Sequence, residues 1–78
     1  MDKTLTLYTG PGCHLCDDAR RVVMEVLPPD WQLREVSIAD SDRLRERYGL
    51  RIPVIAGAGG EKGWPFSPGQ VRGLIACN

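Results

Sequence analysis

Two cysteines, Cys13 and Cys16, are the residues whose type and spacing most directly indicate chemistry. They begin and end the run Cys13-His14-Leu15-Cys16, which directly follows Gly10-Pro11-Gly12. Residues three apart on a helix share one face, so the two sulfur atoms can meet there. A bond that forms and breaks between them would take up and release electrons by thiol–disulfide exchange.

The two cysteines are expected to differ in reactivity because they occupy different places at the start of a predicted helix. Cys13 is at the cap, where unpaired backbone N–H groups and the helix dipole lower a thiol pKa below its free value of about 8.5. Asp17 and Asp18 oppose this effect without cancelling it. Cys16 lies further inside. We therefore predict that Cys13 is the attacking nucleophile and Cys16 the resolving thiol.

Nearby residues leave alternatives open. His14 either donates to a thiolate or raises the oxidising power of the pair, or it is a solvent-facing side chain. Cys77 is interpreted as an incidental free thiol, with a resolving or dimerising role as the alternative. Metal or iron–sulfur binding would use the same cysteines, but structural zinc requires four ligands, and the spacing of His14 and Cys77 matches no standard zinc finger. We expect no metal site.

The elements that position the pair follow from hydrophobic periodicity and from turn residues. Strands are predicted over residues 4–9, 31–38, 52–56 and 61–66, and helices over 13–27, over 41–48 and from 67–70 onward. Gly49 suits the end of the second helix. Ser67 and Gln70 match the capping-box pattern that begins the third. The predicted buried stripes consist of Leu15, Ala19, Val22, Val23 and Val26 in the first helix, and Val71, Leu74 and Ile75 in the last.

The order of these elements is β-α-β-α-β-β-α, which predicts a single α/β domain over residues 1–78. The β-α-β start implies parallel strands that are joined by a right-handed crossover. A hairpin near the end adds an antiparallel strand, so the sheet is expected to be four-stranded and mixed. The continuous apolar run at 52–56 is typical of a strand that is covered on both sides, so helices are expected on both faces.

The composition indicates which classes of partner and which cellular location to expect. Ten basic residues balance ten acidic ones, which argues against nucleic acid as a partner. Arginines do gather over residues 43–51, but acidic residues are interleaved with them, as on a solvated helix face. No apolar run is long enough for a membrane span, and the N-terminus lacks the pattern of a secretory signal. We expect a cytoplasmic monomer that does not bind membranes.

Three segments resemble the glutaredoxin-like branch of the thioredoxin superfamily: Leu7-Tyr8-Thr9, Cys13-His14-Leu15-Cys16, and the run from Tyr48 to Val54. The chain is most similar to small bacterial members with a C-H-L-C centre and a W-P-F segment, here Trp64-Pro65-Phe66. The resemblance implies a thioredoxin/glutaredoxin-like fold and a thiol–disulfide oxidoreductase. Its partner would be a disulfide-containing protein or a small thiol.

The resemblance also implies roles for the residues before the third strand. Pro53 would be a cis-proline that faces the cysteines, and the backbone of Ile52 would pair with an extended substrate. Substrate contacts are thus assigned to Ile52 and Pro53, with a trans Pro53 at a strand start as the alternative. His14, between the cysteines, is a third candidate for substrate contact. No cofactor would be bound, and glutathione or a thioredoxin-type reductant would donate electrons.

The chain departs from true glutaredoxins in ways that leave glutathione specificity open. His14-Leu15 replaces the usual Pro-Tyr pair between the cysteines, and the basic residue just upstream is missing. The glycine pair and Asp that bind the glutathione carboxylate are also unmatched, because Gly59-Gly60 falls in the predicted hairpin. The free N–H groups at Ser67-Pro68-Gly69 are suited to an anion. A non-catalytic interaction module on the same fold remains the alternative function.

Overall fold

The structure is a computed structural model that describes residues 3–76. Its strands and helices follow the predicted order, with one short 3-10 helix added over Ile38–Asp40. The elements in chain order are β1 (Thr4–Thr9), α1 (His14–Val26), β2 (Gln32–Ser37), α2 (Asp42–Tyr48), β3 (Val54–Gly57), β4 (Gly60–Gly63) and α3 (Pro68–Ala76).

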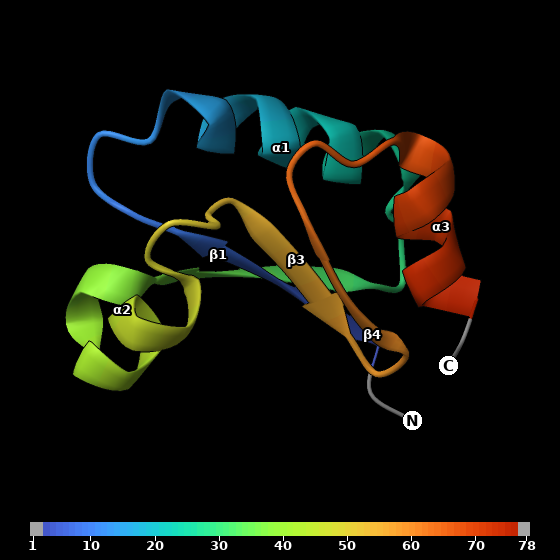
Figure 1. Cartoon of the computed structure of the whole chain (residues 1–78). Helices are drawn as coiled ribbons and strands as arrows, with labels where there is room; N and C mark the ends of the chain where they lie inside the picture. Colours follow the sequence, from blue (N-terminus) through green and yellow to red (C-terminus); the bar gives the residue numbers. More distant parts are fainter. Residues whose placement is uncertain (1–2, 77–78) are drawn as a thin grey trace.

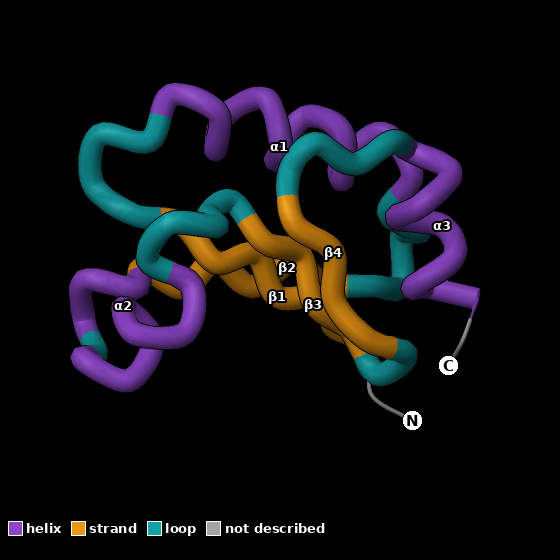
Figure 2. The backbone as a smooth tube through the Cα atoms, in the orientation of Figure 1, coloured by secondary structure: helices purple, strands orange, loops and turns teal. Residues whose placement is uncertain are grey.

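The four strands form one mixed sheet in the order β2-β1-β3-β4 (Figure 2). β1 and β2 are parallel, with Thr4 opposite Gln32 and Thr9 opposite Ser37. β3 is antiparallel to both β1 and β4. The parallel pair, the hairpin and the mixed sheet are therefore confirmed.

The main hydrophobic core lies between one face of the sheet and the helices α1 and α3 (Figure 1). The alternation in β1 explains this, because side chains two residues apart point to the same face of a strand. The fully or almost fully buried members of this core are Leu5, Leu7, Ala19, Val23, Ile55, Phe66, Val71 and Leu74. The core thus fixes α1, and with it the cysteine pair, against the central strands.

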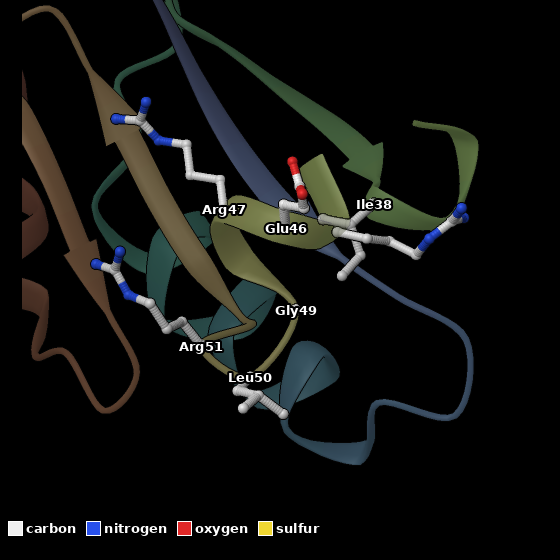
Figure 3. A pocket seen from close by; sticks show the side chains of 7 residues that line it. Ile38, Glu46, Arg47, Gly49, Leu50 and Arg51 are labelled. Carbon is white, nitrogen blue, oxygen red and sulfur yellow. The ribbon is translucent and has the colours of Figure 1, made fainter. Parts of the chain in front are cut away.

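A second, smaller cluster lies on the other face of the sheet, where α2 packs (Figure 1). Ile38, Tyr48 and Val54 are buried there, and Tyr8 stacks on Tyr48 with ring centroids 4.4 Å apart. Helices on both faces are therefore confirmed. The chain beyond α2, including Leu50, borders a hollow at the surface of the molecule (Figure 3).

The predicted start of α3 is confirmed by its hydrogen bonds. The N–H of Gln70 donates to Oγ of Ser67 at 3.2 Å, and the N–H of Ser67 donates to Oε1 of Gln70 at 2.9 Å. Each side chain thus satisfies a backbone N–H that the helix itself leaves unpaired. Gly49 is the C-cap of α2, as expected, and its backbone is right-handed helical.

One buried-stripe prediction was wrong. Leu15 is 49% exposed, whereas Cys16, Ala19 and Val23 form the buried face of α1. Each residue rotates an α-helix by about 100°. The face that meets the sheet is centred on Cys16, so Leu15 points away from it. Val22 and Val26 are partly buried against the core, as expected.

Several strand ends also differ from the prediction. At the hairpin, Gly57 and Gly60 were predicted as turn but belong to β3 and β4, whereas the other ends of these strands and both ends of β2 were predicted too long. Trp31 and Ile38 lie outside β2, Ile52 and Pro53 precede β3, and β4 ends at Gly63. The last register pair between β3 and β4 joins Val54 and Gly63, so residues 64–66 lie outside the paired strands. Proline has no N–H to donate to a ladder, which explains why Pro53 and Pro65 end the pairing.

Candidate redox site

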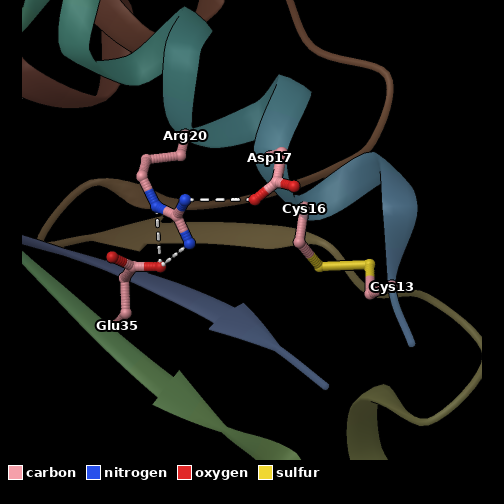
Figure 4. Close-up of polar contacts among 5 residues, drawn as sticks. All are labelled: Cys13, Cys16, Asp17, Arg20 and Glu35. Atoms are coloured by element: carbon pink, nitrogen blue, oxygen red, sulfur yellow. Dashed lines mark hydrogen bonds and ion pairs between the residues drawn. A yellow bond between two sulfur atoms is a disulfide. The ribbon is translucent and has the colours of Figure 1, made fainter. Parts of the chain in front are cut away.

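The cysteine pair forms a disulfide at the start of α1 (Figure 4). Cys13 is the N-cap of the helix, and Cys16 lies in its first turn, with their Cα atoms 5.4 Å apart. The N–H of Cys16 donates to the carbonyl of Cys13 at 3.3 Å, and the N–H of Cys13 donates to the carbonyl of Gly10 at 3.4 Å. The turn after β1 therefore places both sulfurs within bonding distance, as the sequence predicts.

The two cysteines differ in their access to solvent. Cys16 is only 4% exposed, because it belongs to the face of α1 that meets the sheet. Cys13 is half-buried, since it lies at the cap, before the helix begins. An incoming disulfide can therefore approach Cys13 more readily than Cys16.

The sulfur of Cys13 accepts no cap hydrogen bond in this disulfide form. The expected stabilisation by amide N–H groups concerns the thiolate, which carries a full negative charge, whereas a disulfide sulfur is neutral and a weak acceptor. The low pKa predicted for the reduced Cys13 thus stays a prediction.

A charged cluster that sequence reasoning missed lies one turn beyond Cys16 (Figure 4). Arg20 donates from Nε and Nη2 to Oε1 of Glu35, at 2.9 Å and 2.6 Å, and from Nη1 to Oδ1 of Asp17 at 3.1 Å. The hydrogen bonds to Glu35 and its charge raise the pKa of Arg20. Arg20 therefore links α1 to β2 and offsets the charge of Asp17 beside the cysteines.

The Asp17–Arg20 spacing of three residues was a signal for the first half of this cluster. The second half had no local signal, because Glu35 lies on β2 and meets α1 only through the sheet register.

The loop before β3 packs against the turn that carries Cys13. A Cβ built on Gly10 would lie 2.7 Å from Cδ1 of Ile52, so a side chain at Gly10 would force the end of the Ile52 side chain to shift. The carbonyl of Gly10 accepts from the N–H of Cys13, so Gly10 belongs to the turn that carries this cysteine. The structure therefore brings Ile52 next to the cysteine turn.

Pro53 has the cis peptide bond that the family resemblance implies. Its side chain is fully buried, and its carbonyl accepts from the N–H of Trp64 at 3.0 Å. Trp64–Pro65 is a second cis bond, which the sequence reasoning did not predict. With Pro53 buried, Ile52, which is half-buried, is the more accessible of the two. Their substrate contacts stay a prediction.

The remaining candidate residues lie apart from this arrangement or outside it. His14 is the first residue of α1 and is exposed. Cys77 lies outside the described residues. Within residues 3–76, no three side chains of the metal-ligating types are grouped as a metal site would require. Over the same residues, no helix has the length and apolar character needed to cross a membrane.

Comparisons with known proteins agree with this geometry. Residues 4–75 match the model of the family described as Glutaredoxin-like domain (DUF836). An X-ray structure of the structural genomics target protein XcR50 from X. campestris is 35% identical, with a TM-score of 0.78, and the match covers 95% of this chain and 97% of that one.

A solution structure of XcR50 from X. campestris is also 35% identical, with a TM-score of 0.77, and the match covers 95% of this chain and 94% of that one. The search of curated proteins found no match. The fold is therefore thioredoxin-like, and its cysteine pair suits a redox thiol role. With nearly its whole length matched, the chain belongs to the glutaredoxin-like domain (DUF836) family.

Proposed function

We propose that the chain is a thiol–disulfide oxidoreductase in which Cys13 attacks a substrate disulfide and Cys16 resolves the intermediate. The observation that carries the proposal is the contrast between a half-buried cap cysteine and a buried partner with which it forms a disulfide. The family membership supports the same chemistry. A non-redox binding module would not require this pairing of access and bonding distance.

The proposed reaction has two exchange steps. The Cys13 thiolate attacks one sulfur of the substrate disulfide, a Cys13–substrate disulfide forms, and the other substrate sulfur leaves as a thiolate that takes up a proton. Cys16 then loses its proton and attacks the sulfur of Cys13, which releases the second substrate thiol. The substrate disulfide is reduced by two electrons, and the Cys13–Cys16 disulfide is the oxidised product.

The return of the electrons requires an external thiol, for which we propose glutathione or a thioredoxin-type protein. Two thiols give up two electrons and two protons, become a disulfide, and restore the Cys13–Cys16 dithiol. The substrates are disulfide-containing proteins or small disulfides. We place the reaction in the cytoplasm, where such reductants keep thiols reduced.

Serine variants of each cysteine test the proposal. Cys13→Ser is expected to abolish disulfide reduction and to trap little mixed disulfide. Cys16→Ser is expected to accumulate the Cys13–substrate disulfide, detected by mass after alkylation, because the second step is blocked. Cys77→Ser serves as the matched control and should retain activity. Full activity in both the Cys13 and the Cys16 variants would refute the proposal.

A further inference from the structure

We propose that Arg47, Leu50 and Arg51 form a docking surface for an acidic segment of a disulfide-bearing peptide or protein. The segment would place carboxylates on the two arginines and an apolar side chain against Leu50. This inference deepens the proposed function, on which it rests, because it names a substrate class for the same cysteine pair. We call these three residues the arginine–leucine surface.

The two arginines are held in place before any ligand arrives. Their guanidinium carbons lie over the ring of Tyr48, at 5.4 Å for Arg47 and 5.9 Å for Arg51 from its centroid. Both also approach the carboxylate of Glu61, at 4.0 Å and 3.6 Å. Figure 3 shows the two guanidinium groups extending to the same side. Groups that are already ordered lose less entropy when they bind, so this arrangement favours binding.

The charges of this cluster do not cancel. Arg47 and Arg51 share one carboxylate, that of Glu61, which also accepts from the hydroxyl of Tyr48 at 2.8 Å. Arg47, Arg51 and Glu61 together therefore carry one excess positive charge. Glu46, which lines the adjoining hollow, has no ion pair with either arginine among the described residues. The side chains of Arg47 and Arg51 are 65% and 54% exposed, so their outer N–H groups face solvent. Guanidinium groups bind carboxylates well because their donors match the two oxygens.

Leu50 adds an apolar part to the same surface. Its side chain is fully exposed, and it directly precedes Arg51 in the sequence. It borders a hollow of about 700 Å³ that Ile38 and Arg47 also line. A single exposed leucine is ordinary on a protein surface. A leucine beside a hollow and two ordered arginines matches a segment that carries both carboxylates and an apolar side chain.

The surface lies within reach of the cysteines. Arg51 is two residues before Pro53, so their Cα atoms are at most roughly 7 Å apart. The residue between them, Ile52, packs at Gly10, whose carbonyl accepts from the N–H of Cys13. An extended chain advances about 3.3 Å per residue. A substrate segment bonded to Cys13 that passes Ile52 therefore reaches Arg51 within a few residues.

The test compares single-turnover rates of the pre-reduced protein with two peptide disulfides. The peptides are identical except that one carries an Asp pair and the other a Lys pair a few residues from its cysteine, next to a leucine. The Asp peptide is expected to react about five- to tenfold faster at low ionic strength, as two partly exposed ion pairs would give. High salt should reduce this preference.

Two double variants separate the surface from general charge effects. Arg47→Gln with Arg51→Gln should remove most of the preference, whereas Arg34→Gln with Arg72→Gln, the same charge change at exposed sites on β2 and α3, should retain it. Leu50→Ser should slow the Asp peptide about three- to fivefold through lost apolar contact. Equal rates for the two peptides, or equal losses in both double variants, would overturn the docking surface.

Two small disulfides identify which claim has failed. Hydroxyethyl disulfide has no charge and should react equally with all variants, which also shows that they are folded. If the wild type does not reduce it, the proposed function fails; if it does but the peptides react equally, only the docking surface fails. Glutathione disulfide tests whether glutathione occupies the surface instead. If the Arg47→Gln/Arg51→Gln variant loses as much rate with glutathione disulfide as with the Asp peptide, the assignment to a peptide segment is overturned.

Discussion

Replacing Tyr48 by phenylalanine would isolate one hydrogen bond beneath the loop that leads to Pro53. The hydroxyl of Tyr48 donates to Oε2 of Glu61 at 2.8 Å. The backbone carbonyl of Tyr48 accepts from the N–H groups of Arg51 and Ile52 at 2.8 Å and 3.1 Å. Tyr48→Phe removes only the hydroxyl and keeps the ring. The change in the free energy of unfolding therefore measures what the hydrogen bond between Tyr48 and Glu61 contributes to stability.

The size of the effect follows from the kind of hydrogen bond that is lost. A hydrogen bond to a charged group contributes about 1.5–3 kcal/mol to stability. The carboxylate of Glu61 is partly exposed and keeps Arg51 at 3.6 Å, so it is not left unpaired. We therefore expect the free energy of unfolding to fall by the lower figure, about 1.5 kcal/mol. For a domain of this size, that loss lowers Tm by roughly 6–12 °C.

The effect should depend on pH in a defined direction. Burial, and then the hydrogen bond to Glu61, raise the pKa of Tyr48 above its ordinary value of about 10. The folded state thus keeps the phenol proton to higher pH than the unfolded chain. The stability contributed by this difference is fully present below the unfolded pKa of about 10 and is lost as pH rises through the folded pKa.

The assay is denaturant unfolding of the wild type and of Tyr48→Phe, followed by circular dichroism at a series of pH values. All other titrating groups are common to both proteins, so the difference between them isolates Tyr48. We expect a constant difference at neutral pH that shrinks above pH about 10. A difference that is absent at neutral pH, or that grows above pH 10, would show that the hydrogen bond does not stabilise the fold.

Five further substitutions test the packing and the helix capping of the fold. Gly10→Ala should lower the free energy of unfolding by about 1 kcal/mol, because the added methyl presses on the Ile52 side chain before the cis-proline. Gly73→Ala has open space around it and should raise the stability of α3 by up to about 1 kcal/mol. Leu7→Ala should cost about 2–5 kcal/mol from the buried core, and Leu50→Ala nearly nothing. Ser67→Ala should cost about 1 kcal/mol through the lost cap. Thermal unfolding measures all five variants.

The cysteine pair and its surroundings could be predicted from the sequence because the signals are local. Alternation in β1, the turn after it and the spacing of Cys13 and Cys16 all lie within a short stretch of chain. The capping box at Ser67 is local in the same sense. Strand ends were less predictable, since β4 ends where its pairing with β3 ends, and pairing depends on residues far apart in the sequence.

The charged groups around the site could not be predicted, for the same physical reason. Arg20 meets Glu35 only because β2 lies beside β1 in a particular register. Arg47 and Arg51 meet Glu61 only through the β3–β4 hairpin. In the sequence, the arginines near residues 43–51 have acidic neighbours and indicate an ordinary solvated helix face. The fold instead gives two of them a shared carboxylate and a shared aromatic ring.

Gly10 shows why the juxtaposition of the two site loops was also beyond sequence reasoning. Next to Pro11 and Gly12, Gly10 is naturally interpreted as part of a turn, which needs no distant partner. In the structure, its lack of a side chain makes room for Ile52, whose neighbour Pro53 has the cis bond. Because Gly10 has no side chain, the Ile52 side chain can pack closely against the cysteine turn at this point. We therefore expect a substrate at Cys13 to contact residues from both loops, and we expect the choice of substrate to depend on the loop between α2 and β3 as well as on the cysteines.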